Sequence, residues 1–551
     1  MENHAIVFME QVFILQAGAN PSEGAGMTMG KSRQDKQLST HIHRPNDDGT
    51  VREQVKAKAV KLAGLPIYRD RPVALLTDLY QLTMMYGQFK NGQHQRRVVF
   101  DMFFRNNPCG NGYTIAAGLE QVVWYIERLH FSDEDIGYLR GLRLFSEEFL
   151  QVLRHFHFSG NIDAVPEGTL VFPNEPLLRI EGPVFEVQLV ESALLSFVNH
   201  QSLIATKAQR VVDAAATTGK GHPGPVIEMG LRRAQNLDAS VFGARAAFIG
   251  GCQATSNVLA GQSFGIPVSG TQGHSWVQSF PDELTAFRAF AQAFPDNVIL
   301  VVDTYDVLHS GVPNAITVGH ELAAHGRNLK GIRIDSGDLA YLSKKARKML
   351  DQAGLPDVGI VASSDLDEWT IRDLIIQGAE ITAWGVGTHL ITSYDCPALG
   401  CVYKLAAQEE AGVLQPKIKV SENASKVTNP GKKKVLRFYV DDQASADMIC
   451  LEDEQFHPSQ PLELFDAVHT YKRKVIRNYE LEELLVPVYV QGELVYELPD
   501  LAEIRARVER GLSRFAPEVL RHTNPYIYHV DLSRSLWDLK NDLIHALRPT
   551  T

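Results

Sequence analysis

The sequence has few cysteines, no long apolar run and no strongly basic tract, and each shortage excludes a class of protein. Only five cysteines are scattered over 551 residues, which is too few for a disulfide framework and fits a reducing cytoplasm. No apolar run is long enough to cross a membrane. The net charge of −11 argues against general nucleic-acid binding. We therefore expect neither a nucleic acid nor a membrane as partner.

The first residues superficially resemble an export signal but lack its positively charged start. Glu2 precedes the apolar part, Glu10 interrupts it, and no Lys or Arg stands ahead of it. This pattern favours a cytoplasmic protein. Residues 1–70 are largely polar after the apolar stretch and are expected to form a poorly ordered leader. A phosphate-loop-like run ending at Gly30-Lys31-Ser32 follows no strand, so it is interpreted as chance.

The length exceeds one hydrophobic core, so two or three domains are expected. Residues 71–200 mix helical runs with short β runs cut by Gly and Pro, which indicates an α+β module. Residues 201–404 are regular and form the expected catalytic domain. Residues 405–551 are mixed again.

Six apolar runs in the central part end in polar or Gly-rich residues, which is the pattern of βα units. They are Val226–Met229, Ile266–Val268, Val298–Val302, Gly331–Ile334, Val358–Ala362 and Ile381–Trp384. Parallel strands present their carboxyl ends at one edge, so the residues that follow should meet there. No G-x-G-x-x-G follows the first strand, which favours an α/β barrel over a doubly wound dinucleotide-binding sheet.

The second of these strand ends carries Thr271 and His274 among small residues. A histidine can act as acid, base or nucleophile, and small neighbours let backbone N–H groups approach an anion. A lone histidine is more often structural than catalytic. The flanking Gly273 and Ser275 at a strand end bring the two interpretations of His274 close to balance.

Two pairs of carboxylates follow neighbouring strands, Asp335 with Asp338 and Asp303 with Asp306. Such pairs can hold ribose hydroxyls or a magnesium ion that accompanies a diphosphate. A helix-capping Asp beside a solvated Asp is the alternative for any one pair. No dedicated protein metal site is predicted.

Cations and small residues complete the predicted edge. Arg232, Arg233 and Arg333 follow strands that should share one mouth, and a guanidinium binds carboxylate or phosphate through two parallel hydrogen bonds. The run Gly385–Thr388 exposes consecutive backbone N–H groups, which suits a phosphate, although a plain tight turn has the same spacing. Together these residues predict an anionic ligand.

At this point the sequence resembles the nicotinate phosphoribosyltransferase family, from about residue 72 to 548. The segments that carry the resemblance occur in the family's order: Thr77–Gln81, Phe103–Pro108, Gly230–Gln235, Ile249–Ala260, Gly270–Ser275, Asp303–Asp306, Gly331–Asp338, Gly385–Thr388 and Leu536–Lys540. The resemblance implies an irregular α/β barrel of the type II phosphoribosyltransferase kind. It also implies an α+β sandwich domain built from the N- and C-terminal segments, with residues 405–551 packing on the N-terminal domain.

The resemblance implies that nicotinate attacks the anomeric carbon of phosphoribosyl diphosphate and that nicotinate mononucleotide and diphosphate form, in NAD salvage. ATP hydrolysis is then coupled to this through a phosphohistidine, with Mg²⁺ accompanying ATP and the sugar diphosphate. Family members are homodimers whose active sites are shared between subunits.

Residue roles follow from the same resemblance, position by position. His274 matches the phosphorylated position, and Asp335 and Asp338 match catalytic lining that meets ribose and diphosphate. The remaining matches are substrate-binding positions: Tyr80, Arg232, Arg233, Thr271, Arg333, Ser336, Gly337, Gly387 and Thr388. Of these, Tyr80, Thr271 and Arg333 would hold nicotinate, Thr388 the 5-phosphate, and the Tyr80 region would come from the partner subunit.

Departures and alternatives remain. Gln272 and Gly273 stand where a bulkier, more apolar pair is usual, and Cys252-Gln253 where an acidic residue is usual.

A nicotinamide- or quinolinate-specific relative with the same barrel is the nearest alternative. A barrel that binds a phosphometabolite without turnover is another, and an aldolase would need a Schiff-base lysine, for which only Lys404 is a candidate.

Overall fold

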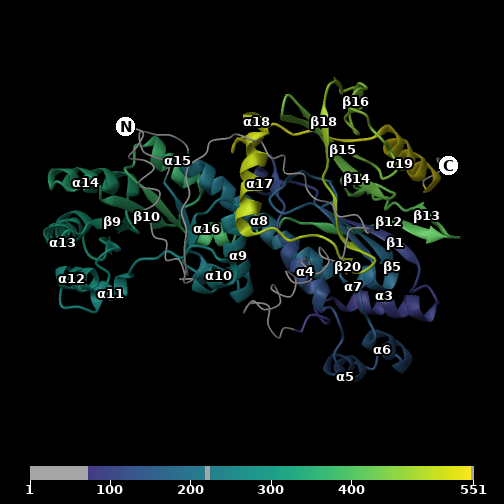
Figure 1. The fold of residues 1–551 in the computed structure, drawn as a ribbon, viewed down its shortest axis with the longest axis horizontal. Coiled ribbons are helices and arrows are strands. Elements are labelled where there is room, and N and C mark those ends of the chain that lie inside the picture. The colour runs from purple at the N-terminus through teal and green to yellow at the C-terminus, as the bar shows by residue number, and fades with distance from the viewer. Residues whose placement is uncertain (1–71, 217–223, 548–551) are drawn as a thin grey trace, which may run out of the picture.

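The computed structural model describes residues 72–216 and 224–547. The leader and the Gly30-Lys31-Ser32 run therefore lie outside the described residues. The molecule is elongated, with a parallel sheet and its helices in one half and antiparallel sheets in the other (Figure 1). The long helix α8 (Glu191–Ala216) runs between the two halves. No helix within the described ranges is long and apolar enough to span a membrane.

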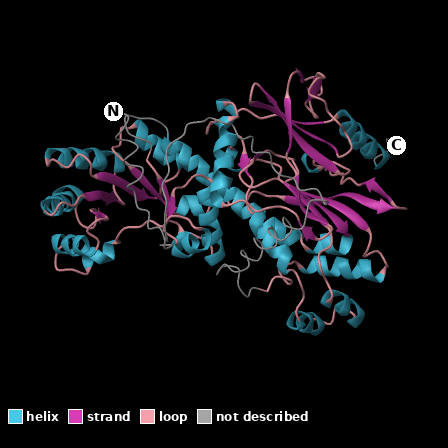
Figure 2. Cartoon of the chain, in the orientation of Figure 1, coloured by secondary structure: helices cyan, strands magenta, loops and turns pink. Residues whose placement is uncertain are grey.

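The antiparallel half is built on a seven-stranded antiparallel sheet, whose strands come from both the N-terminal and the C-terminal parts of the chain. Its order is β13-β12-β1-β5-β3-β19-β20, so strands from residues 97–183 pair with strands from residues 402–494 (Figure 2). The strands are β1 (Arg97–Phe103), β3 (Asn161–Ala164), β5 (Leu178–Pro183), β12 (Val402–Glu410), β13 (Val413–Pro416), β19 (Val486–Val490) and β20 (Glu493–Leu494). This interleaving forms the predicted domain of N- and C-terminal segments.

A second, four-stranded sheet of the C-terminal segment lies beside the first. Its order is β18-β14-β15-β21. The elements are β14 (Lys433–Val440), β15 (Gln443–Leu451), β18 (Glu480–Glu483) and β21 (Val530–Leu532), with hairpin strands β16 (Leu462–Phe465) and β17 (Arg473–Ile476). Helices α17 (Leu501–Ser513), α18 (Pro517–Leu520) and α19 (Arg534–Leu547) complete this segment, with the turn η5 (Ala424–Lys426).

Short helices surround the sheets of this half. They are α3 (Leu79–Lys90), α4 (Leu119–Arg128), α5 (Asp133–Gly141), α6 (Glu147–Arg154) and α7 (Val184–Leu189), with the turn η2 (Pro108–Gly110) and the small pair β2 (Thr114–Ile115) and β4 (Leu170–Val171). Ser132 and Asp135 form a capping box, since each side chain accepts from the other residue's backbone N–H. That box fixes where α5 begins.

The catalytic half is a curled parallel sheet with the order β7-β6-β11-β10-β9-β8. The strands are β6 (Val226–Glu228), β7 (Ala254–Thr255), β8 (Val298–Val301), β9 (Leu329–Ile334), β10 (Gly359–Ser364) and β11 (Ala383–Val386). The covering helices are α9 (Leu237–Ile249), α10 (Val258–Phe264), α11 (His274–Gln278), α12 (Glu283–Ala293), α13 (Val312–Ala324), α14 (Leu339–Gln352), α15 (Glu368–Ile376) and α16 (Thr388–Ile391), with η3 (Leu231–Arg233) and η4 (Val307–Gly311). The α/β-barrel class is confirmed in this irregular, open form.

One predicted strand is wrong. Ile266–Val268 forms only a single bridge, between Val268 and Thr255, and the short strand at this place is β7 instead. Pro267 has no N–H to donate, so the ladder cannot continue through it. Its carbonyl still accepts from Thr255 N at 3.0 Å, and this leads the chain to His274 at the same edge.

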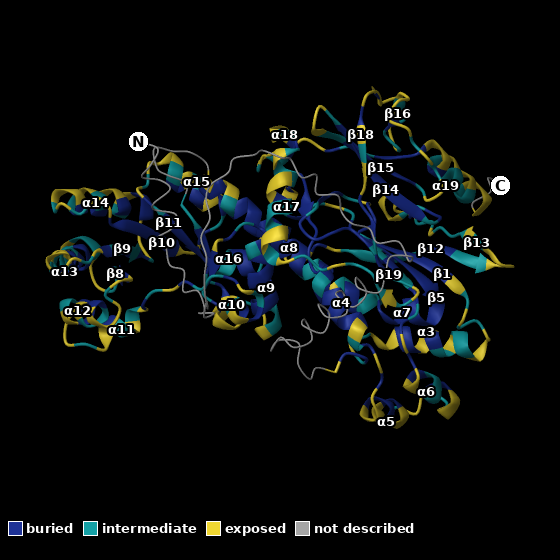
Figure 3. Ribbon diagram, viewed as in Figure 1, coloured by how far each residue is buried: buried dark blue, intermediate teal, exposed yellow. Residues whose placement is uncertain are grey.

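Two large apolar cores hold the halves together, and α8 contributes to both. Leu203 belongs to the core of the antiparallel half, whereas Ile204 and Ala205 belong to the core of the barrel half. Figure 3 shows α8 buried along much of its length between the two halves. Burial of this helix on two sides fixes the barrel relative to the antiparallel sheets.

Candidate active site

A polar cavity of about 180 Å³ lies at the carboxyl ends of the parallel strands. It is lined by Met229, Arg232, Arg233, Arg333, Asp335, Ser363, Ser364, Asp365, Gly385, Gly387 and Thr388. These residues lie in the last positions of β6, β9, β10 and β11 or just after them, and the four strands are neighbours in the sheet. Residues from four separate strand ends therefore meet in one cavity, as the strand-end pattern predicted.

Arg333 is the most firmly positioned cation of the cavity. Its Nε donates to Ser363 Oγ at 2.8 Å, one terminal nitrogen donates to Thr271 Oγ1 at 3.1 Å, and the other lies 3.0 Å from Asp335 Oδ1. The side chain is only 12% exposed. The nitrogen bonded to Thr271 also donates to Gln272 O at 3.3 Å, so the guanidinium keeps its charge and one N–H, in a fixed direction, for an anionic ligand.

His274 opens the short helix α11 and lies against the same carboxylate. Its Nδ1 is 3.2 Å from Thr304 Oγ1, and its Nε2 is 3.5 Å from Asp335 Oδ2 and 4.0 Å from Asp303 Oδ1. The side chain is 38% exposed. Asp335 therefore lies between His274 and Arg333, which places the imidazole at the cavity edge with room for an incoming group.

Asp303 and Asp335 form the acidic side of the site. Asp303 Oδ2 accepts from the Asp335 backbone N–H at 3.1 Å and from Ser336 Oγ at 2.6 Å, whereas its Oδ1 is buried without a hydrogen-bond partner among the described residues. Burial raises the pKa of Asp335, but the hydroxyl of Ser363 and the charge of Arg333 outweigh it, so its net pKa lies below the ordinary value. Asp335 is thus a carboxylate at neutral pH.

A buried carboxylate supports the turn that carries Arg232 and Arg233. Glu228, at the end of β6, accepts from the Gly230 backbone N–H and from Thr255 Oγ1. Burial raises the pKa of Glu228, and these two hydrogen bonds oppose the rise. Arg232 and Arg233 are exposed at the cavity mouth, where they can reach an anionic ligand.

The backbone of the Gly385–Thr388 segment packs closely against Met229, which lines the cavity. A Cβ at Gly385 would lie 2.8 Å from Met229 Sδ, and one at Gly387 would lie 3.2 Å from Met229 O. Ser364 beside it has φ of 145°, a region almost exclusive to glycine, which costs of order 1–3 kcal/mol. Thr388 begins α16 at the floor of this loop.

Six predicted site residues are not among those that line the cavity: Tyr80, Thr271, His274, Ser336, Gly337 and Asp338. Thr271 and His274 lie against Arg333 and Asp335 at its edge, and Ser336 donates to Asp303. Asp338 caps α14 by accepting from Tyr341 N at 2.9 Å, and its role toward substrate stays a prediction. Gly337 has φ of +79°, which shapes the turn between Ser336 and Asp338. Tyr80 lies on α3 in the antiparallel half, away from the parallel sheet of the same chain (Figure 1).

Sequence reasoning gave no role to several residues that shape the site. Ser363 bridges Arg333 and Asp335, and Met229 provides the one apolar side chain among the residues that line the cavity. Gln272 is 5% exposed, and neither polar atom of its amide has a partner in the described part of the chain. The sequence did give one signal for Gln272, because this residue differs from the bulkier, more apolar residue that is usual at its position in the family.

Comparison with known proteins decides the family. The model of the nicotinate phosphoribosyltransferase (NAPRTase) family matches residues 225–449, and the models of its N-terminal and C-terminal domains match residues 75–199 and 432–540. The nicotinate phosphoribosyltransferase of Bacillus subtilis is 47% identical over 87% of this chain and 97% of its own length. This chain belongs to the nicotinate phosphoribosyltransferase family.

Relatives in animals and a solved structure extend this family match. The Caenorhabditis elegans and human nicotinate phosphoribosyltransferases are 38% and 34% identical, over 85% and 86% of this chain and 93% and 97% of their own lengths. The crystal structure of human nicotinic acid phosphoribosyltransferase superposes with a TM-score of 0.76 at 33% identity, covering 85% of this chain and 100% of that one. The nicotinate phosphoribosyltransferase fold thus includes both halves of this molecule, and the chain is an enzyme that acts on small molecules.

Proposed function

We propose that the protein transfers the phosphoribosyl group of phosphoribosyl diphosphate to nicotinate in the cytoplasm. The pyridine nitrogen uses its lone pair to bond the anomeric carbon, the bond from that carbon to the diphosphate oxygen breaks, and diphosphate leaves with the electron pair. Nicotinate mononucleotide is the other product. The position of Arg333 at the cavity wall, held by Thr271, Ser363 and Asp335, is the observation that carries this proposal.

The charge of Arg333 favours nicotinate over nicotinamide. A carboxylate gains both the free N–H and the charge of the guanidinium, whereas an uncharged amide gains no ion pair. The alternative substrate quinolinate has two carboxylates and would require a second cation in the ring pocket. Met229 offers the ring an apolar contact in a cavity that is otherwise polar.

Arg232, Arg233 and Thr388 are proposed to hold the phosphates of the sugar donor. The two guanidiniums can neutralise charge that develops on the leaving diphosphate, and the Gly387–Thr388 backbone can approach the 5-phosphate closely. The transfer of the phosphoribosyl group needs no strong base, because the pyridine nitrogen is already a nucleophile.

Asp303 and Asp335 fit a Mg²⁺ ion that would reach the site with a diphosphate or ATP. The buried, unpartnered Oδ1 of Asp303 and the ionised Asp335 are hard oxygen donors of the kind that Mg²⁺ prefers. No group of three or more metal-ligating side chains exists among the described residues, so phosphate oxygens and water would complete the coordination. When bound, the ion would neutralise charge on the leaving group.

His274 is proposed to couple ATP to the transfer. A ring nitrogen would attack the γ-phosphorus of ATP, the bond to the β-phosphate oxygen would break, and ADP would leave; water later hydrolyses the phosphohistidine. The support is the position of the imidazole beside Asp303 and Asp335, at the edge of the anion-binding cavity. A phosphoryl group there would change the charge that the substrates meet.

We propose a homodimer whose active sites are shared. Helix α3 and the turn before it expose Leu76, Leu79, Tyr80 and Met84. A second exposed apolar set lies near the barrel mouth at Leu231, Leu237, Val258 and Leu259. In an isologous dimer the first set of each subunit can cover the second set of its partner. This pairing would bring Tyr80 to the partner's barrel.

Charge around Tyr80 supports the same arrangement. Burial raises the pKa of Tyr80, and nearby Glu191 adds to the rise. Burial lowers the pKa of Lys404, and the charges of Lys419 and Arg105 add to the fall although Glu191 opposes it. Glu191 thus acts on both Tyr80 and Lys404, and the cluster of Lys404, Lys419 and Arg105 near Glu191 is where a partner's anionic substrate would be neutralised.

Incubation with phosphoribosyl diphosphate, Mg²⁺ and one ring at a time tests the function. Mass spectrometry should detect nicotinate mononucleotide and an equal amount of diphosphate from nicotinate. Exclusive turnover of nicotinamide or quinolinate would assign the protein to a different ring. Binding of the sugar diphosphate without turnover of any ring would favour a non-catalytic barrel.

A further inference from the structure

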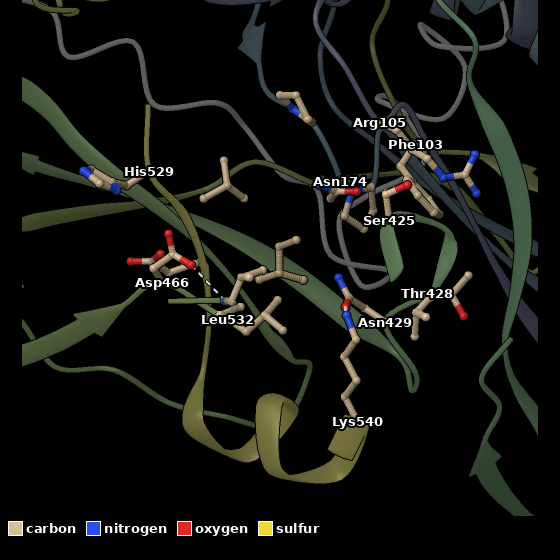
Figure 4. A pocket seen from close by; sticks show the side chains of 18 of the residues that line it. Phe103, Arg105, Asn174, Ser425, Thr428, Asn429, Asp466, His529, Leu532 and Lys540 are labelled. Carbon is tan, nitrogen blue, oxygen red and sulfur yellow. Dashed lines mark hydrogen bonds between the residues drawn. The ribbon is translucent and has the colours of Figure 1, made fainter. Parts of the chain in front are cut away.

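A second cavity, far larger than the active site, lies in the antiparallel half. Its volume is about 440 Å³, and it opens between β1, β14, β21 and α19 (Figure 4). We call it the C-terminal cavity. Its size is within the range of small-molecule sites. Arg105 lines this cavity and also belongs to the basic cluster proposed above to meet a partner's substrate, but no role proposed above uses Lys433, Lys540, Asp101 or Asp531.

Two ammonium groups line one side of the cavity: Lys433 is buried and paired with a carboxylate, and Lys540 is half-buried and bonded only to an amide. Lys433 is 2% exposed, and its Nζ donates to Asp101 Oδ2 at 2.7 Å and to Gly431 O at 2.6 Å. Lys540 Nζ donates to Asn429 Oδ1 at 2.8 Å. Burial lowers the pKa of Lys540, and the charge of Lys433 lowers it further. An anion in the cavity would relieve this repulsion, and each ammonium has an N–H left to donate.

Acceptors for hydroxyl groups lie in the same cavity. Asp101 is 3% exposed, and its Oδ1 has no hydrogen-bond partner among the described residues. Asp531 is 5% exposed and lines the cavity from β21. Burial raises the pKa of Asp531 to about 7, and nearby Asp466 adds to the rise. A buried carboxylate oxygen without a donor is costly, and a ligand hydroxyl would supply that donor.

Acceptors lie at both ends of the C-terminal cavity, because Asp101 is paired with Lys433, whereas Asp531 lines the cavity from β21 near Asp466. In Figure 4, Lys540 reaches from α19 toward Asn429 with Thr428 nearby, while Asp466 and His529 lie across the cavity. A ligand that spans it therefore needs an anionic group at the end with the two lysines and hydroxyl groups toward both ends. We propose that the C-terminal cavity binds a phosphorylated sugar, with its phosphate on Lys540 and Lys433 and its hydroxyls on Asp101 and Asp531.

Titration calorimetry on the full chain with glucose 6-phosphate as probe tests this site. The Lys540→Met protein should bind the probe at least ten-fold more weakly than the unaltered protein, whereas Lys540→Arg should bind it nearly as well. Lys348→Met, which removes an exposed lysine on α14, is the matched control and should leave binding unchanged. If Lys540→Met fails to fold, Asn429→Asp places a carboxylate beside Lys540 and should weaken binding similarly.

Two further arms separate this site from the catalytic cavity. Arg232→Gln should leave glucose 6-phosphate binding unchanged, and inorganic phosphate should bind more weakly than the sugar phosphate. Loss of binding in Arg232→Gln with retention in Lys540→Met would overturn the proposal, because the probe would then occupy the active site. Equal affinity for inorganic phosphate, or no binding of either probe at millimolar concentration, would also overturn it.

Discussion

At the scale of single residues, the account depends on how Arg333 is held. Three partners fix its guanidinium: Ser363 on β10, Thr271 in the loop before α11, and Asp335 just after its own strand. The sequence could predict the cation but not these contacts. Ser363 looked like any serine after a strand, because its role exists only when β9 and β10 pair side by side. Strand-end position is readable from the sequence, whereas contacts between strand ends require the register.

Arg333→Lys should reduce kcat/KM for nicotinate at least about 100-fold, because an ammonium cannot keep the contacts to Ser363, Thr271 and Asp335 and still direct an N–H at the carboxylate. Initial rates at varied nicotinate concentration measure this. Arg327→Lys is the matched control, since Arg327 forms an exposed ion pair with Asp296 on the far side of the barrel. Unchanged kcat/KM in Arg333→Lys would exclude a direct role in ring binding.

Gln272→Leu should raise the free energy of unfolding by about 1–3 kcal/mol, because it removes a buried amide without hydrogen-bond partners. The backbone carbonyl that accepts from Arg333 at 3.3 Å stays in place. Urea unfolding measures the change, with the exposed Gln352→Leu as control, expected within about 0.5 kcal/mol of the unaltered protein. A less stable Gln272→Leu protein would mean that the amide has a partner.

At the scale of elements, the parallel strands were readable where they were long and apolar, as in β9 and β10. The two-residue strand β7 was not, because two residues carry no period and the nearby run Ile266–Val268 looked stronger. The run contains Pro267, and because proline has no N–H to donate, Ile266–Val268 forms only a single bridge and no strand. Close backbone approaches between elements were equally hidden in the sequence.

Gly311→Ala should destabilise the protein by more than about 3 kcal/mol. The new Cβ would lie 1.9 Å from Val302 O, a backbone atom that cannot move without shifting β8 and the adjoining Asp303. Thermal unfolding measures the loss, and nicotinate turnover should fall with it. Gly137→Ala is the control, because nothing lies within 4 Å of its Cβ and helix propensity predicts a gain of up to about 1 kcal/mol. Equal melting temperatures for the two variants would refute the packing argument.

At the scale of the whole molecule, the chain returns from the barrel to pair β12 with β1 across about three hundred residues of sequence. No local periodicity predicts such a pairing, and only the family resemblance implied it. The resemblance likewise implied that Tyr80 belongs to the active site of a partner subunit. Within one chain, α3 lies in the antiparallel half, away from the parallel sheet (Figure 1). Subunit sharing remains a prediction.

Mixing two inactive variants tests that prediction. Tyr80→Ala and His274→Ala should each be nearly inactive alone. After the subunits are exchanged, about a quarter of the original activity should return, because half of the dimers are mixed and each mixed dimer has one intact site. Activity that stays at the sum of the two separate variants would show that each subunit supplies its own Tyr80.

The central claim is that His274 accepts a phosphoryl group beside Arg333 and Thr388 in one cavity. Intact-mass analysis after incubation with Mg²⁺ and ATP tests it most directly. The account predicts one added phosphate that is labile in acid and absent from His274→Ala, with ATP-coupled nucleotide formation reduced in the same variant. An unmodified mass for the original protein, or an equal phosphate on His274→Ala, would contradict it.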